Sequence, residues 1–160
     1  MGIFEYIMNG DLKSVKNLID SGFDINTKDV GGWSPLQYAT YCDHLDIVEY
    51  LISKGVDIES KDNSGITSLV RSVINNKTKL FKYLISVGTN VNTQDFNGDT
   101  PLHTNIICNN GDLEITKLLL KHGADPYIKN YGGHTPLDFC KNKEEFLNLI
   151  RMVKLKELYK

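Results

Sequence analysis

An internal repeat is the feature that most constrains the fold of this chain. Glycine follows a pair of aliphatic residues at three evenly spaced positions, Gly22, Gly55 and Gly88, and Gly123 closes a similar segment after a slightly longer interval. Repeats with a period of about 20 to 50 residues build solenoids, in which each unit packs mainly on its neighbours. The spacing therefore predicts an elongated stack of similar units.

Each unit after the first begins with a tight turn and a helix start. The turn sequences occupy residues 29–32, 62–65, 95–98 and 130–133. A hydroxyl residue follows each turn, and in three units a proline comes next: Ser34-Pro35, Thr67-Ser68, Thr100-Pro101 and Thr135-Pro136. A hydroxyl at the N-cap accepts a hydrogen bond from a free N–H group, and proline is tolerated in the first helical turn. A short first helix is predicted after each turn.

A second helix is predicted in each unit after a left-handed corner. The corner positions hold residues that tolerate this backbone conformation: Gly10, Asp43, Asn76 and Gly111. The apolar residues that follow share one helix face, as Leu45, Val48, Leu51 and Ile52 do. The glycines of the repeating series end these second helices.

Three consecutive motifs carry a family resemblance. They are Gly-Asp-Thr-Pro-Leu-His at 98–103, Leu-Leu-Leu-Lys-His-Gly-Ala-Asp at 118–125 and Gly-His-Thr-Pro-Leu-Asp at 133–138. In these motifs the chain resembles the ankyrin-repeat family. The resemblance covers essentially the whole chain and implies an all-α solenoid that forms one domain, 1–160. It further implies an N-terminal cap (1–28), three full repeats (29–61, 62–94 and 95–129) and a C-terminal cap (130–160).

Two units depart from the pattern of this family. In unit 62–94, Ser68 replaces the proline and Val70 the histidine, so we expect this unit to be weaker than its neighbours. Unit 95–129 carries two extra residues around 108–110, which predict a longer helix or a bulged corner. The last helix is predicted from about Lys143 toward Leu158.

Composition argues against several classes of partner and site. A net charge of −2 and a pI near 6.1 give no reason to expect nucleic acid or an anionic membrane. No apolar run reaches membrane-spanning length. The first residues have neither the basic flank nor the apolar run of a secretion signal, so secretion is not expected. Three widely spaced cysteines fit neither a disulfide framework nor a zinc site, so a reducing, cytoplasmic location is expected. If the source is a virus or parasite, that cytoplasm would be the host cell's.

No pattern of residues indicates catalysis, a metal or a cofactor. The resemblance implies that His103 bonds the backbone of a neighbouring turn rather than acting as a base. The segment 95–99 matches the opening of a calcium loop, but Thr100 and Ile106 stand where that loop needs glycine and glutamate. Cys140 falls in a small, buried slot of the unit. We therefore predict a protein that is not an enzyme.

The resemblance implies that a protein partner is bound at the turn tips and the inner face of the first helices. The residues expected there are Val30, Trp33, Tyr41, Ile66, Ile74, Phe96, Asp99, Tyr131 and His134. A solvated turn does not require large apolar side chains, and leaving them exposed favours association. Packing of these side chains on neighbouring tips is the alternative. The predicted function is that of a monomeric, non-catalytic adaptor or inhibitor.

Other interpretations remain open at this stage. A structural or regulatory solenoid without a fixed ligand is the alternative function, because Asn26 and Asn92 resemble positions hydroxylated in many ankyrin proteins. Lys28, Lys61 and Lys129 form a column that we interpret as a solvated, largely neutralised ridge. The basic and apolar residues after Ile150 predict a helix that caps the last unit, with a membrane-surface or dimer helix as the alternative.

Overall fold

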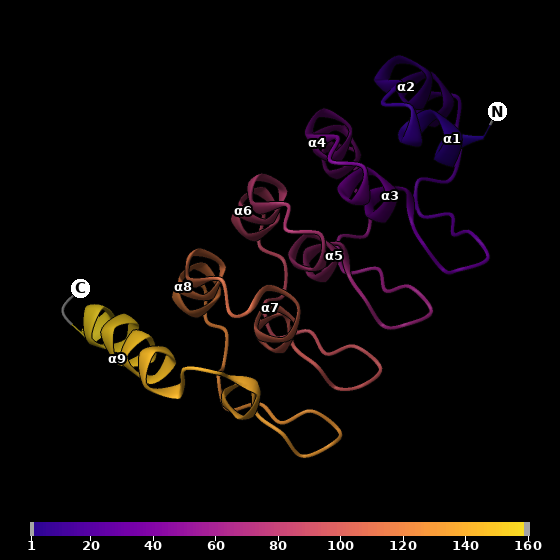
Figure 1. The fold of residues 1–160 in the computed structure, drawn as a ribbon. Coiled ribbons are helices and arrows are strands. Elements are labelled where there is room, and N and C mark those ends of the chain that lie inside the picture. Colours follow the sequence, from indigo (N-terminus) through magenta and orange to yellow (C-terminus); the bar gives the residue numbers. More distant parts are fainter. Residues whose placement is uncertain (1, 159–160) are drawn as a thin grey trace.

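The computed structural model describes residues 2–158, with side chains as far as Val153. Within these residues the regular elements are all helices (Figure 1). They are α1 (Ile3–Met8), α2 (Leu12–Asp20), α3 (Pro35–Tyr41), α4 (Leu45–Ser53), α5 (Ser68–Ile74), α6 (Thr78–Ser86), α7 (Pro101–Asn109), α8 (Leu113–Lys121), the 3-10 helix η1 (Pro136–Phe139) and α9 (Lys143–Leu158). None of these helices is long and apolar enough to cross a bilayer.

The helices form two parallel rows. The inner helices α1, α3, α5, α7 and η1 pack on one another in chain order. The outer helices α2, α4, α6 and α8 each pack on the inner helix before them, and α9 packs on α8. The turns that precede α3, α5, α7 and η1 extend beyond the inner row as separate loops (Figure 1). This arrangement confirms the predicted all-α solenoid, whereas the single-domain division at the stated boundaries stays a prediction.

Left-handed residues produce the corner between the helices of each pair, as predicted. Asp43 and Asn76 have φ angles of 65° and 52°, and Gly10 and Gly111 have angles of 68° and 72°. In the fourth unit Asn110 is also left-handed, with a φ of 55°. There α7 has nine residues where α3 and α5 have seven, whereas the corner keeps three residues as in the two preceding pairs. The two extra residues therefore lengthen the helix and not the corner.

Hydrogen bonds from side chains fix the starts of the inner helices. The Ser34 hydroxyl accepts from the Gln37 N–H, and the Gln37 side chain accepts in return from the Ser34 N–H at 2.8 Å. Thr100 and His103 make the same reciprocal pair at the start of α7. Such a capping box satisfies two of the N–H groups that a helix start leaves free. In α5 the Thr67 hydroxyl caps Val70, whose side chain has no group to return the bond.

The core runs along the stack between the two rows. It is formed by residues that are fully buried in successive helices, including Ile7, Leu36, Leu51, Leu69, Leu84, Leu102 and Leu119. Phe146, Leu149 and Ile150 of α9 cover the last repeat pair. The predicted capping residues Lys154, Leu155, Lys156, Leu158 and Lys160 lie outside the described side chains. Their suggested role stays a prediction.

Two side chains on inner helices, those of Gln37 and His103, each form a hydrogen bond with the backbone of the turn that follows in the next unit. Gln37 donates from Nε2 to the carbonyl oxygen of Ile66 at 2.6 Å, and His103 contacts the carbonyl oxygen of His134 at 3.0 Å. The equivalent residue between them is Val70, which has no donor to reach the following tip. Unit 62–94 therefore lacks one connection that both of its neighbours make.

We expect amide hydrogens in residues 62–94 to exchange faster than those of residues 29–61 and 95–129. In repeat arrays a missing connection lowers local stability, and local opening sets the exchange rate. Hydrogen exchange followed by mass spectrometry on the whole chain measures this directly. Equal protection of α5 and its two neighbours α3 and α7 would show that Val70 has no such effect.

Candidate functional site

The turn tips form a continuous row held by backbone hydrogen bonds. Asn63 donates its N–H to the Gly31 carbonyl at 3.1 Å, Phe96 to the Ser64 carbonyl at 3.1 Å, and Tyr131 to the Asn97 carbonyl at 2.9 Å. Inside each tip, an Asp or Asn side chain accepts N–H groups of its own turn, as Asp95 does from Asn97 and Asp99. The tips therefore present their outer side chains from fixed positions.

Three of the predicted binding residues are highly exposed at the ends of the tips. The exposed fractions are 100% for Val30, 65% for Phe96 and 74% for Tyr131. The Phe96 ring lies against Gly65 of the preceding tip so closely that an added Cβ would be 2.7 Å from it. Tyr131 lies against Gly98 in the same way. Each ring thus rests on a neighbouring tip and leaves most of its surface to solvent.

Trp33 behaves differently from the other aromatic tip residues. Its ring centre lies 5.2 Å from that of Tyr38 and 5.6 Å from that of Tyr41. The guanidinium carbon of Arg71 lies 3.6 Å from the indole centre, which is a close cation–π contact. Trp33 is therefore partly buried between two units and matches the alternative in which a tip residue packs on its neighbours.

Arg71 is a buried charge that the sequence reasoning missed. Its guanidinium pairs with the Asp62 carboxylate, and its Nε has no hydrogen-bond partner among the described residues. Burial lowers the pKa of Arg71, although the Asp62 carboxylate acts in the opposite direction. The repeat spacing could have indicated this pair. Arg71 and Asp62 stand one repeat after Tyr38 and Asp29, and the Tyr38 hydroxyl donates to the Asp29 carboxylate at 2.7 Å.

The remaining predicted tip residues take part in contacts within the protein. Ile66 is partly buried, and its carbonyl accepts the bond from Gln37. Asp99 accepts a hydrogen bond at 2.8 Å from the Asn130 side chain. His134 is exposed, and its ring lies 5.6 Å from that of Phe139. Binding of a partner by these three residues stays a prediction.

A second exposed apolar surface lies on the inner helices. The predicted residues Tyr41 and Ile74 are 50% and 36% exposed. Met8 and Ile107, both 51% exposed, occupy the same position one repeat before and one repeat after this pair. Because the inner helices pack in series, these four residues lie in a row, which we call the inner column. Sequence reasoning named only its two central members, although the repeat spacing was enough to find the others.

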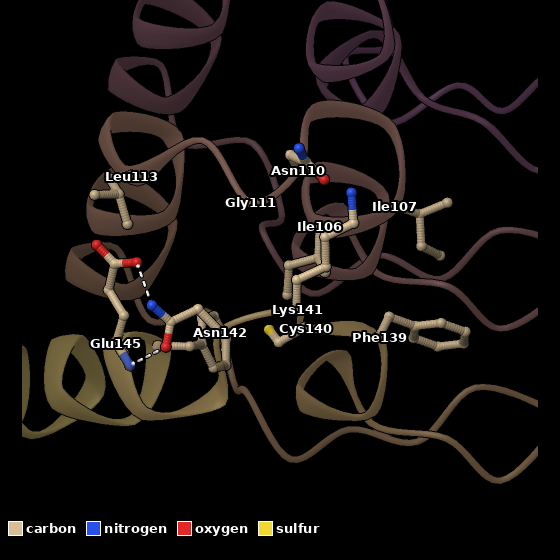
Figure 2. A pocket seen from close by; sticks show the side chains of 11 residues that line it. Ile106, Ile107, Asn110, Gly111, Leu113, Phe139, Cys140, Lys141, Asn142 and Glu145 are labelled. Atoms are coloured by element: carbon tan, nitrogen blue, oxygen red, sulfur yellow. Dashed lines mark hydrogen bonds between the residues drawn. The ribbon is translucent and has the colours of Figure 1, made fainter.

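The inner column ends beside a pocket of about 350 Å³ (Figure 2). The inner helix η1 has four residues, whereas α7 has nine, so the last turn of α7 has no inner helix beside it. Ile106, Ile107 and Phe139 contribute apolar surface, and Asn142 and Glu145 at the start of α9 are bonded to each other. Burial raises the pKa of Cys140, which keeps its thiol protonated near neutral pH.

The polar groups around these surfaces have structural partners. The Thr100 N–H donates to His103 Nδ1 at 3.1 Å, so the ring hydrogen is on Nε2 and is donated to the His134 carbonyl. This confirms the structural role predicted for His103. Within residues 2–158 no three His, Cys, Asp or Glu side chains converge as metal ligands would. Burial raises the pKa of the Cys42 thiol, which makes it less nucleophilic at neutral pH.

The lysine column and the two asparagines also bond neighbouring units. Lys28 Nζ donates to the Lys61 carbonyl at 2.7 Å, and Lys61 Nζ donates to the Gln94 carbonyl at 2.7 Å. Asn26 accepts from the Asp57 N–H, and Asn92 accepts from the N–H of the following unit at 2.8 Å. These charges and amides therefore support the stack. Hydroxylation of the asparagines stays a prediction.

Comparison with known proteins places the chain in a family. The model for ankyrin repeats in three copies matches residues 3–95 and 69–155. A stretch of 30 residues is 60% identical to part of a Rickettsia bellii (strain RML369-C) protein named as an ankyrin repeat protein, and covers 19% of this chain. The stretch spans 4% of that relative's length. The chain belongs to the ankyrin-repeat family, whose members are generally protein-interaction modules and typically not enzymes.

Proposed function

We propose that this chain is a non-catalytic adaptor or inhibitor that binds one protein partner across its turn tips and inner column. The observation that carries this proposal is that exposed apolar side chains recur at matching positions of the repeat and form two rows. Val30, Phe96 and Tyr131 belong to the first row, and Tyr41 and Ile107 belong to the second. Clustered, exposed apolar residues typically mark interaction surfaces, and aromatic residues are common at the centres of interfaces.

Neighbouring helices in such a stack are separated by roughly 8 to 10 Å, so four units span on the order of 30 Å. A surface of that length accommodates a standard interface of about 800 Å² per partner. Three free cysteines support a cytoplasmic location, because a reducing environment keeps thiols unpaired. We propose that the chain acts there as a monomer.

Site-specific photo-crosslinking in the cell that expresses the protein tests this function. A photoreactive amino acid replaces Val30, Phe96 or Ile107 in the full chain, and Lys82 on outer helix α6 serves as the control position. We expect the same partner to be crosslinked from the first three positions and not from Lys82. Crosslinking from Lys82 alone would place the partner on the outer row and contradict the proposal.

The double variant Phe96→Ala/Tyr131→Ala is expected to weaken binding of that partner about 100-fold, since each ring is an exposed anchor candidate. The melting temperature should change by only about 2 °C, because truncation of exposed side chains creates no core cavity. Binding is measured by titration of the purified crosslinked partner. Met152→Ala removes a similarly exposed apolar side chain from α9 and should leave affinity unchanged.

A further inference from the structure

The three central inner helices, α3, α5 and α7, present a surface almost without charge, whereas α1 and η1 carry the exposed Glu5 and Asp138. Among the residues of α3, α5 and α7, Arg71 is the only one with a charged side chain, and it is buried and paired with Asp62. The outer helices, in contrast, carry exposed charges such as Lys13, Glu49 and Lys82. A partner that lies on the inner column therefore meets no charge from these three helices. Binding is strongest when the contact face of the partner is also apolar and uncharged, because a charge buried there would have no counter-ion.

The members of the inner column follow one another at the separation of the stacked helices, roughly 8 to 10 Å. In an α-helix, residues seven apart are separated by about 10.5 Å along the axis and return to nearly the same face, within about 20°. One helix laid along the column therefore places a side chain between successive units at every seventh residue. In a β-strand, three residues cover about 10 Å, but the third side chain points to the opposite face.

A polyproline helix also repeats every three residues, or about 9.3 Å, so spacing alone does not separate it from an α-helix. The chemistry of the inner column distinguishes the two. Of its four members only Tyr41 carries a side-chain hydrogen-bond donor. An extended segment along four units would leave most of its backbone groups without partners. An α-helix satisfies its own backbone and needs only apolar contact.

We infer that the inner column binds an amphipathic α-helix of the partner whose apolar, uncharged residues recur every seven positions. The helix lies along the stack, and a large apolar side chain near one end enters the pocket beside Ile107 and Phe139 (Figure 2). This inference rests on the proposed function, because it specifies what part of a protein partner the inner surface takes.

Selection of peptides from a random display library on the folded full chain tests the inference. Peptides retained by Ile107→Asp are removed in a counter-selection, and the enriched peptides are sequenced and synthesised. We expect large apolar residues seven positions apart and a gain of helical circular dichroism on binding. The dissociation constant should rise at least about tenfold with Ile107→Asp or Ile107→Lys, because either charge would be buried at the contact.

Asn17→Asp places the same negative charge on an exposed position of outer helix α2 and should leave the dissociation constant unchanged. Raising NaCl from about 0.05 to 0.5 M should change the dissociation constant less than about threefold, because screening acts on charges. Apolar residues enriched at every third or every second position, or no enrichment that depends on Ile107, would overturn the inference. Crosslinking of a partner from Phe96 in the same protein would then still support the proposed function.

Discussion

Replacing Asp62 with asparagine is expected to lower the free energy of unfolding by about 3 to 5 kcal/mol, because Arg71 would remain buried without its counter-ion. The two side chains are 3% and 9% exposed. Asparagine keeps an oxygen for the turn N–H groups of Ser64 and Ile66, which Asp62 now bonds, so the turn itself is preserved. The decrease in unfolding free energy therefore reports the loss of the Asp62 charge and not a disruption of the turn. Urea unfolding followed by circular dichroism gives this free energy.

The chain contains a matched control at the same position of the preceding unit. Burial raises the pKa of Asp29, but hydrogen bonds from the Tyr38 hydroxyl and from turn N–H groups outweigh it and leave that pKa below its usual value. Because Tyr38 is neutral, Asp29→Asn breaks no charge pair and should cost only about 1 kcal/mol. Equal losses in the two variants would show that the Arg71 charge is stabilised by something other than Asp62.

The double variant Asp62→Asn/Arg71→Met extends this test. Removing both charges eliminates the uncompensated guanidinium, and apolar replacements of buried ion pairs are often neutral. We expect the double variant to be more stable than Asp62→Asn alone. Lower stability of the double variant would indicate that the contact between Arg71 and Trp33 contributes more than the uncompensated buried charge costs.

Leu84→Ala is expected to lower the free energy of unfolding by about 2 to 5 kcal/mol, because Leu84 is fully buried and its removal leaves a cavity in the core. Leu113→Ala provides the control, since Leu113 is 42% exposed at the start of α8 and loses less buried surface. Urea unfolding of both variants measures the difference. A loss below about 1 kcal/mol for Leu84→Ala would mean that neighbouring units relax into the space.

The sequence predicted the parts of the fold that depend on local residue chemistry. Left-handed corners at Asp43 and Asn76 follow from residues that tolerate positive φ. The start of α7 follows from a hydroxyl N-cap and a proline, and its extra length from the two added residues. The corners and the helix start need no contact with a neighbouring unit, so the local sequence was enough to predict them. The extra length of α7 required comparison with the spacing of the other units, which left a longer helix and a bulged corner as alternatives.

Contacts between units were harder to predict. An arginine on a short helix normally extends into solvent, and Arg71 is buried because Trp33 of the preceding unit covers it. The pocket beside Ile107 depends on the shortening of η1 to four residues, which the Pro136-Leu137 helix start does not indicate. For the exposed site, Met8 and Ile107 were predictable from the repeat alone, whereas the burial of Trp33 was not.

The linear order of the units determines how the stack responds to a pulling force. Each tip is bonded to the next along the chain, from Gly31 to Asn63, then from Ser64 to Phe96. The same units are also joined by the packing of their inner helices. Tension applied at the two ends passes from unit to unit, so each junction as a whole carries the full load. The stack then opens at its weakest junction first and lengthens in steps. Each released repeat adds about 110 Å of extended chain.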